Sequence, residues 1–148
     1  MAPLVRIPRN DPAAASRVYR NRLESRFVEI LDLKCDDRAL SLISGRSRAV
    51  RRYDIHELML TDESGAQPGG TANGVHYIGF VEFPAGGMLV YGDSVVIGGR
   101  TVGTIAGFDE SHFPNHYNIV IKGPRRLSGV DLGQYPNDPV IFEPAQRE

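Results

Sequence analysis

Short runs of alternating apolar and polar residues dominate the chain after about position 75, a pattern typical of β-strands with one buried face. The clearest run covers 75–83, and Gly98-Gly99 lies between two further runs. Two glycines between β-patterned runs are a strong signal for a two-residue hairpin. We therefore expect strands at 75–83, 88–91, 94–97, 101–106, 117–122 and 140–142.

The first part of the chain, up to about position 60, carries a different pattern. Asp11-Pro12 is followed by three alanines, which is typical of a helix N-terminus, and apolar residues then continue at helical spacing. This pattern predicts a helix from Asp11 to about Ser25, followed by a strand over FVEILDL. Two further strands are expected at 40–44 and 49–60, paired with each other through the segment SGRSR.

Glycine usage divides the chain sharply. All glycines except Gly45 lie from Gly65 onward, and glycines supply the positive φ angles of tight turns. The segment 61–74, TDESGAQPGGTANG, has no large apolar side chain. We expect it to be a flexible loop, a domain seam or a lid.

Together these patterns predict a single, mainly β domain over 1–148. The expected fold is a small β-barrel of roughly seven to nine short strands with an N-terminal helix. Within it, 1–60 holds the helix and the first strands, 75–123 the glycine-rich barrel core, and 124–148 a loop-rich tail.

Composition and charge limit the classes of partner. The chain has 148 residues and a net charge of −1, which gives no electrostatic basis for binding nucleic acid. No apolar run approaches the roughly 18–20 residues of a membrane span. The single cysteine, Cys35, excludes an intramolecular disulfide framework and fits a reducing compartment. With no apolar signal segment at the N-terminus, we expect a cytoplasmic protein.

The histidines suggest one kind of site, a metal centre. His112 and His116 are four residues apart, but Pro114 between them disfavours a helical ligand pair. From a loop and a strand start, they could still combine with Asp109 or Glu110 as two imidazoles and a carboxylate around a divalent metal. Ordinary loop histidines are the alternative. No organic cofactor is expected, since the sequence has no P-loop and no other cofactor motif.

Metal-free acid–base catalysis is the other kind of site, because imidazole titrates near neutral pH. We expect His76 and His116 to face each other across a barrel mouth. Strict alternation places Glu82 on the same strand face as His76, between apolar neighbours. These three are the candidate catalytic residues, and a solvent-facing charge is the alternative for Glu82. Three tyrosines are expected to contact the substrate through their rings and not to act as proton donors. They are Tyr77, Tyr91 and Tyr117.

Three segments carry a family resemblance: VHYIGFVEF, GDSVVIGGRTVGTIAG and NHYNIVIKG. Over about 75–123 the chain resembles the glucitol/sorbitol-specific IIA proteins of the sugar phosphotransferase system. The resemblance implies a small β-barrel and transient phosphorylation of a histidine, with His76 at the matching position. The second histidine of that family's strand is replaced here by Ile78, and Asn115 stands where the family has a glycine.

Two classes of function remain open at this point. The first is a small enzyme of the lyase, isomerase or cyclase type, which binds a small metabolite in the barrel mouth and uses histidine and carboxylate chemistry. The 61–74 loop could then close over the site. The second is a non-enzymatic carrier or binding module, such as a phosphohistidine protein. Histidines without a chemical role are the plain alternative to both. The arginine run 46–52 and exposed sheet edges make a homodimer a further expectation.

Overall fold

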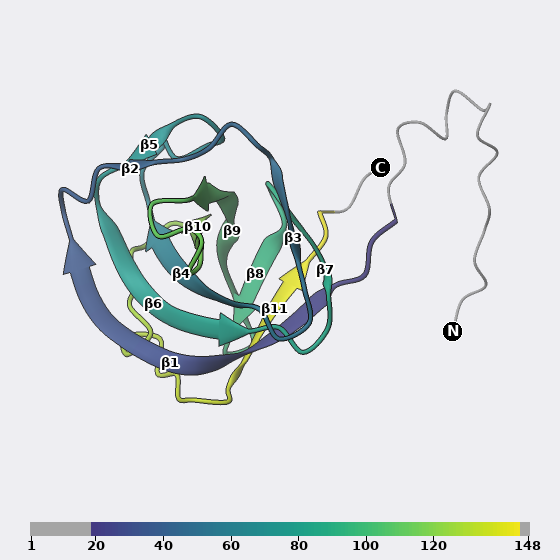
Figure 1. Ribbon diagram of the computed structural model, residues 1–148. Coiled ribbons are helices and arrows are strands. Elements are labelled where there is room, and N and C mark those ends of the chain that lie inside the picture. Colours follow the sequence, from purple (N-terminus) through teal and green to yellow (C-terminus); the bar gives the residue numbers. More distant parts are fainter. Residues whose placement is uncertain (1–18, 146–148) are drawn as a thin grey trace, which may run out of the picture.

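The computed structural model describes residues 19–145 of the chain, which fold around a closed seven-stranded β-barrel (Figure 1). The strands are β1 (Leu23–Cys35), β2 (Leu40–Ser41), β3 (Ser47–Val50), β4 (Ile55–Thr61), β5 (Thr71–Ala72), β6 (Val75–Glu82), β7 (Gly87–Val90), β8 (Ser94–Ile97), β9 (Arg100–Asp109), β10 (Asn118–Lys122) and β11 (Pro139–Glu143).

The barrel strands follow the order β1-β11-β8-β9-β10-β4-β6, and β6 pairs with β1 to close the ring. Neighbouring strands are antiparallel everywhere except between β10 and β4, which run parallel. Two further sheets have two strands each and combine β2 with β5 and β3 with β7. The predicted fold class, a mainly β protein with a small barrel, is therefore confirmed.

Alternation located the strands of the second half well. Strand β8 has the predicted bounds, and β6 and β11 each differ from prediction by no more than one residue at either end. The β8–β9 connection is the predicted hairpin. Gly98 and Gly99 take φ angles of 62° and 75° there, which glycine adopts without the steric penalty of a Cβ atom.

The predicted N-terminal helix is wrong where it can be compared with the structure. Residues 19–22 have no regular secondary structure, and 23–25 belong to β1. The expected helix start at Asp11 lies outside the described residues. Leu23 and Phe27 are buried on the inner face of β1, which pairs with both β6 and β11. Pairing on both edges overrides the local helical pattern. In the part of the chain described here, no helix is long and apolar enough to cross a membrane.

The predicted pairing of 40–44 with 49–60 is also wrong. Strand β2 pairs with β5, β3 pairs with β7, and β4 pairs with β6 and β10. Tyr53 has a φ angle of 74° and lies in the turn that separates β3 from β4. That turn breaks the single long strand that the sequence indicated.

Segment 61–74 is a packed part of the fold and not an open lid. Ala66 is buried within it, and β5 forms near its end. Thr61 Oγ1 donates to Gly74 O at 2.7 Å, and the carboxylate of Glu63 accepts from the backbone N–H groups of Asn73 and Gly74 at 2.8 and 2.6 Å. Polar contacts thus replace the large apolar side chains that the segment lacks.

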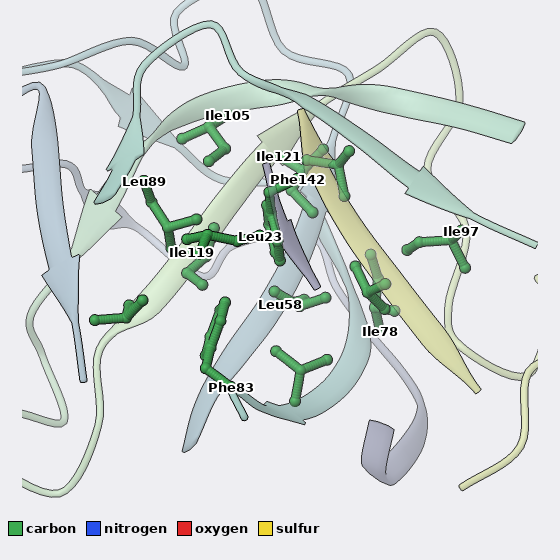
Figure 2. Close-up of a cluster of buried hydrophobic side chains, with 14 of the residues drawn as sticks. Leu23, Leu58, Ile78, Phe83, Leu89, Ile97, Ile105, Ile119, Ile121 and Phe142 are labelled. Carbon is green, nitrogen blue, oxygen red and sulfur yellow. The ribbon is translucent and has the colours of Figure 1, made fainter. Parts of the chain in front are cut away.

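Large apolar side chains fill the inside of the barrel (Figure 2). Every barrel strand contributes side chains to this inner cluster. Burial of each large apolar side chain stabilises the fold by about 1.5–3 kcal/mol. The interior is therefore a packed core. The barrel-strand members are Leu23, Phe27, Leu58, Leu60, Ile78, Val81, Val95, Ile97, Ile105, Phe108, Ile119, Ile121, Val140 and Phe142.

A second apolar cluster covers part of the outer wall. Met59 from β4 and Val120 from β10 project outward, on the opposite face from their inward neighbours. Leu40 and Leu42 pack on them, together with Ala66 and other small residues. The outer face of β4 and β10 is therefore covered by the chain, and it is on this face that polar groups become buried.

Strand β6 changes phase at a β-bulge next to Gly79, where its pairing with β1 and β4 shifts. Gly79 has a φ angle of 155°, and a Cβ atom there would clash with the carbonyl oxygen of Glu29. After the bulge, Val81 points inward and Glu82 outward, whereas His76 lies on the inner side of the strand before it. The prediction that His76 and Glu82 share a face is therefore wrong.

Candidate functional site

A row of side chains crosses the outer face of the barrel on five neighbouring strands. The register pairs Glu29 with Phe80, Phe80 with Glu57, Glu57 with Asn118, and Asn118 with Asp109. Glu57, Asn118 and Asp109 are buried, with exposed fractions of 6%, 0% and 4%. Two carboxyl groups and an amide thus lie side by side out of solvent, which is unusual unless they have partners or a chemical role.

Asp109 fixes the segment that covers this row. Its Oδ2 accepts hydrogen bonds from Ser111 N at 3.3 Å, Ser111 Oγ at 2.6 Å and Asn118 Nδ2 at 2.7 Å. These bonds tie the start of the β9–β10 connection, residues 110–117, to strand β10. Asn118 Oδ1 is buried and has no hydrogen-bond partner among the described residues. The amide therefore has an acceptor to spare inside the site.

Glu57 and His116 meet under this connection. His116 Nε2 lies 3.4 Å from Glu57 Oε1, and the imidazole packs edge-on against Phe80 at 5.0 Å between ring centroids. His116 Nδ1 is 2.6 Å from Asn115 Oδ1. When Nδ1 carries the ring hydrogen it donates to Asn115, which leaves Nε2 as an acceptor. Within the described chain this buried nitrogen makes no hydrogen bond, although Glu57 Oε1 lies close to it. A protonated Glu57 can donate to this nitrogen.

Burial favours the neutral form of both groups. Burial raises the pKa of Glu57 to about 7; the Arg38 charge opposes the rise, and Glu29 and Asp109 add to it. Burial lowers the pKa of His116, and the neighbouring imidazole of His112 lowers it further. Near neutral pH a proton of this pair is therefore favoured on the Glu57 carboxyl over the His116 imidazole, which is the reverse of the order in water.

Arg38 forms the rim of the site with groups from two other segments. Its Nε donates to Tyr77 Oη at 3.0 Å, and its Nη2 is 3.4 Å from both Ser111 Oγ and His112 Nε2. The His112 ring stacks on His116 with centroids 5.2 Å apart. A guanidinium group, a phenol and an imidazole thus meet beside the His116 ring, which itself lies against Glu57.

Arg48 holds the covering segment from the other side. It pairs with Glu110, and its guanidinium group lies over the rings of Phe113 and Tyr117, at 5.7 and 4.8 Å from their centroids. Arg48 comes from β3, so three separate parts of the chain position the 110–117 segment. This reduces the freedom of His112 and His116, which a pre-organised site requires.

A polar group on the inner face adjoins the site without sharing it. His56 stacks on Tyr117 at 3.6 Å between centroids, and Tyr117 N donates to His56 Nδ1 at 3.3 Å. Burial lowers the pKa of His56 to about 4, and burial raises the pKa of Tyr117. Within 19–145, neither His56 Nε2 nor Tyr117 Oη has a hydrogen-bond partner.

The structure separates the three predicted catalytic residues. His116 belongs to the outer-face site, but His76 does not oppose it: His76 Nδ1 lies 3.9 Å from Asp131 Oδ2. Glu82 is paired in the sheet with Ile55 on one side and Arg26 on the other. The β6 bulge and the different faces account for this separation.

The three predicted substrate tyrosines are also dispersed. Tyr77 lies in the site beside Arg38, whereas Tyr117 packs in the inner cluster. Tyr91 lies at the end of β7, where the guanidinium group of Arg46 covers its ring at 4.7 Å. Only Tyr77 therefore has its hydroxyl at the rim of the outer-face site.

The predicted metal-ligand set lies in one neighbourhood. His112 and His116 are stacked, and Asp109 accepts from Ser111 and Asn118. Among residues 19–145, no three His, Cys, Asp or Glu side chains are arranged to hold one metal ion. Metal binding stays a prediction.

Several residues of the site escaped the sequence analysis, Glu57 and Arg38 foremost among them. Glu57 could have been noticed, because it is the single carboxylate in the mostly apolar run IHELML of a predicted strand. Arg38 gave no such signal, because its neighbours in the site come from β6 and the β9–β10 connection. A short stretch of sequence around Arg38 cannot show that these distant segments lie beside it.

Comparison with known protein families identifies one match. The model of a family of unknown function, DUF6917, matches residues 17–143. The chain belongs to this family. The DUF6917 match spans every strand of the barrel and all residues of the site. No curated protein and no solved structure matches the chain. The resemblance to the IIA proteins therefore remains a prediction.

Proposed function

We propose that the protein is an enzyme that moves a proton on a small metabolite, of the isomerase or lyase type, with Glu57 and His116 as its acid–base pair. The observation that supports this proposal most is the 3.4 Å approach of His116 Nε2 to Glu57 Oε1 in a buried setting. General acids and bases work best when their pKa lies near the operating pH. The pKa of Glu57, raised to about 7, meets that condition.

The surrounding groups suit such a reaction. In the proposed chemistry one member of the pair removes a proton from the substrate, and the other returns a proton to a second position or to a leaving group. Negative charge that develops on the substrate would be stabilised by the guanidinium group of Arg38 and the hydroxyl of Tyr77. Asp109, through Asn118 and Ser111, keeps the pair in position.

The test is proton exchange into candidate substrates. A panel of small keto acids, hydroxy acids and sugar phosphates would be incubated in deuterated buffer and followed by NMR. For a compound that the wild-type protein exchanges, Glu57→Gln and His116→Gln should each slow exchange about 100-fold or more. The matched controls, Glu24→Gln at an exposed position near the start of β1 and His76→Gln, should leave it unchanged. Wild-type exchange rates in both site variants would contradict the proposal.

A carrier function at His76 is the second candidate, and one observation favours it. The pKa of the His76 imidazole is lowered mainly by burial. The positive charges of Lys34 and Arg126 lower it further. The same two cations would neutralise a phosphoryl group on that ring. Phosphoramidate, a small phosphoryl donor, should then label the wild-type protein but not His76→Gln. Equal labelling of the two proteins, or no labelling of either, would contradict this function.

A further inference from the structure

Arg38 is a half-buried cation whose charge is not matched by a contacting acid. Among residues 19–145, the ion pairs made by arginines involve Arg20, Arg22, Arg48, Arg51 and Arg126 and leave Arg38 without one. Its hydrogen-bond contacts are all to neutral or titratable groups: Tyr77, Ser111 and His112. A guanidinium group so placed is suited to bind an oxyanion through paired N–H donors.

The acids next to Arg38 in the chain, and two acids of the site, have other contacts. Asp36 pairs with Arg126 at 3.5 Å, and Asp37 accepts from Cys35 Sγ at 3.6 Å. Asp109 already accepts three hydrogen bonds in the site. Glu57 Oε1 lies 3.4 Å from His116 Nε2, and the raised pKa of Glu57 keeps a part of it neutral at pH 7. The positive charge at the rim is therefore available to a ligand.

The neighbours of Arg38 add donors to the same place. The Tyr77 hydroxyl accepts from Arg38 Nε, so its own hydrogen is free to be donated. His112 Nε2 lies 3.4 Å from Arg38 Nη2, and an oxyanion between the two would favour the ring tautomer or charge state that donates. Tyrosine and histidine from two other segments thus meet at the Arg38 guanidinium group.

We infer that the substrate of this site carries an oxyanion, a carboxylate or a phosphate ester, which Arg38 binds together with Tyr77 and His112. This inference rests on the proposed function, because it assigns the substrate class for the same site. His112 stacks on His116 with 5.2 Å between ring centroids. The bound oxyanion would therefore lie one imidazole away from the acid–base pair, which selects a small molecule whose reacting atom is a few bonds from its charged end.

The test uses three probes at constant ionic strength: malonate, inorganic phosphate and the uncharged analogue malonamide. Binding is followed by the ring proton signals of the histidines in NMR, with calorimetry for affinity. Malonate or phosphate should shift the His112 and His116 signals, and malonamide should not. A response to malonate alone identifies a carboxylate substrate, and a response to phosphate alone a phosphate ester. Equal binding of malonamide, or no shift with either anion, would overturn the inference.

Variants separate this inference from the proposed function. Arg38→Gln should weaken anion binding about ten- to hundred-fold, the range expected for hydrogen bonds to a charged group. The control Arg52→Gln, an exposed arginine that lies over Tyr53, should bind as the wild type does. Glu57→Gln should still bind the anion and lose proton exchange.

The pattern of failures is then diagnostic. Arg38→Gln with unchanged anion affinity, beside an inactive Glu57→Gln, would remove the oxyanion assignment and leave the acid–base function standing. Weakened binding in Arg38→Gln beside normal exchange in Glu57→Gln would leave an anion site without that chemistry. Because binding is measured on the folded variants by their histidine signals, loss of structure is recognised directly.

Discussion

His116 Nε2 lies 3.4 Å from Glu57 Oε1, although Glu57 belongs to β4 and His116 to the connection that leads into β10. Strands β4 and β10 run parallel, so that the β3–β4 turn and the β9–β10 connection approach the barrel from the same end. The site therefore combines a buried acid from one strand with a base from the segment that leads into its neighbour. This arrangement has measurable effects on stability, even before a substrate is known.

Glu57→Gln is expected to change how stability depends on pH. The pKa of Glu57 rises from 4.5 to about 7 on folding, so the folded protein binds more protons than the unfolded chain between these pH values. Ionisation of the carboxyl then destabilises the fold as pH rises, by about 3 kcal/mol in total. Urea unfolding should show Glu57→Gln gaining this amount on the wild type between pH 4.5 and pH 8. Glu24→Gln should show no gain.

His56→Gln is expected to have the opposite effect. The pKa of His56 falls from 6.5 to about 4 on folding, so the folded protein binds fewer protons in that window and loses stability as pH falls through it. Removing the imidazole should abolish this loss, about 3 kcal/mol between pH 7 and pH 4. The two effects offset each other in the wild type between about pH 4.5 and 6.5. Parallel pH profiles for His56→Gln and the wild type would contradict this account.

Gly79→Ala is expected to destabilise the barrel by about 2 to 4 kcal/mol, since the new Cβ atom would clash with the carbonyl oxygen of Glu29 at a φ angle of 155°. Gly65→Ala is the matched control, because the nearest atom to its Cβ would be Thr71 O at an ordinary 3.5 Å. Urea denaturation of the two variants gives the comparison. Equal stability would mean that the bulge does not require glycine.

Tyr117→Phe is expected to leave stability unchanged or to raise it by up to about 1 kcal/mol. The Tyr117 hydroxyl is buried and has no hydrogen-bond partner within the described chain, so its removal breaks no bond. Ser25→Ala provides the contrast, because Ser25 Oγ donates to Val140 O at 2.9 Å in a buried setting. That variant should lose about 1 kcal/mol in denaturant titrations. If Tyr117→Phe lost more stability than Ser25→Ala, the Tyr117 hydroxyl would have a bound partner.

Sequence patterns anticipated the parts of the fold that depend on neighbouring residues. Alternation over 94–97 and the Gly98-Gly99 pair are local signals, and they located β8 and its hairpin. Strand β1 was missed at its start, because its partners β6 and β11 come from distant parts of the chain. The helical spacing of its apolar residues was then the stronger local signal.

The site was less predictable than the barrel. His116 was identified because its residue type suits acid–base chemistry, but its partner was expected to be His76. The bulge at Gly79 shifts the faces of β6 by one residue, and alternation counted along the sequence does not detect such a shift. Glu57 and Arg38 reach the site through strand order and the path of the β1–β2 connection, which no short pattern encodes.

A parallel pair such as β4 and β10 is required because the barrel has an odd number of strands. When strands alternate in direction around a closed ring, an odd number of them leaves one adjacent pair pointing the same way. Seven strands therefore impose a seam, and at a seam both entering segments lie on one rim. The acid–base pair lies at that seam. Changes in the length of either entering segment would therefore alter the site while the barrel interior stays the same.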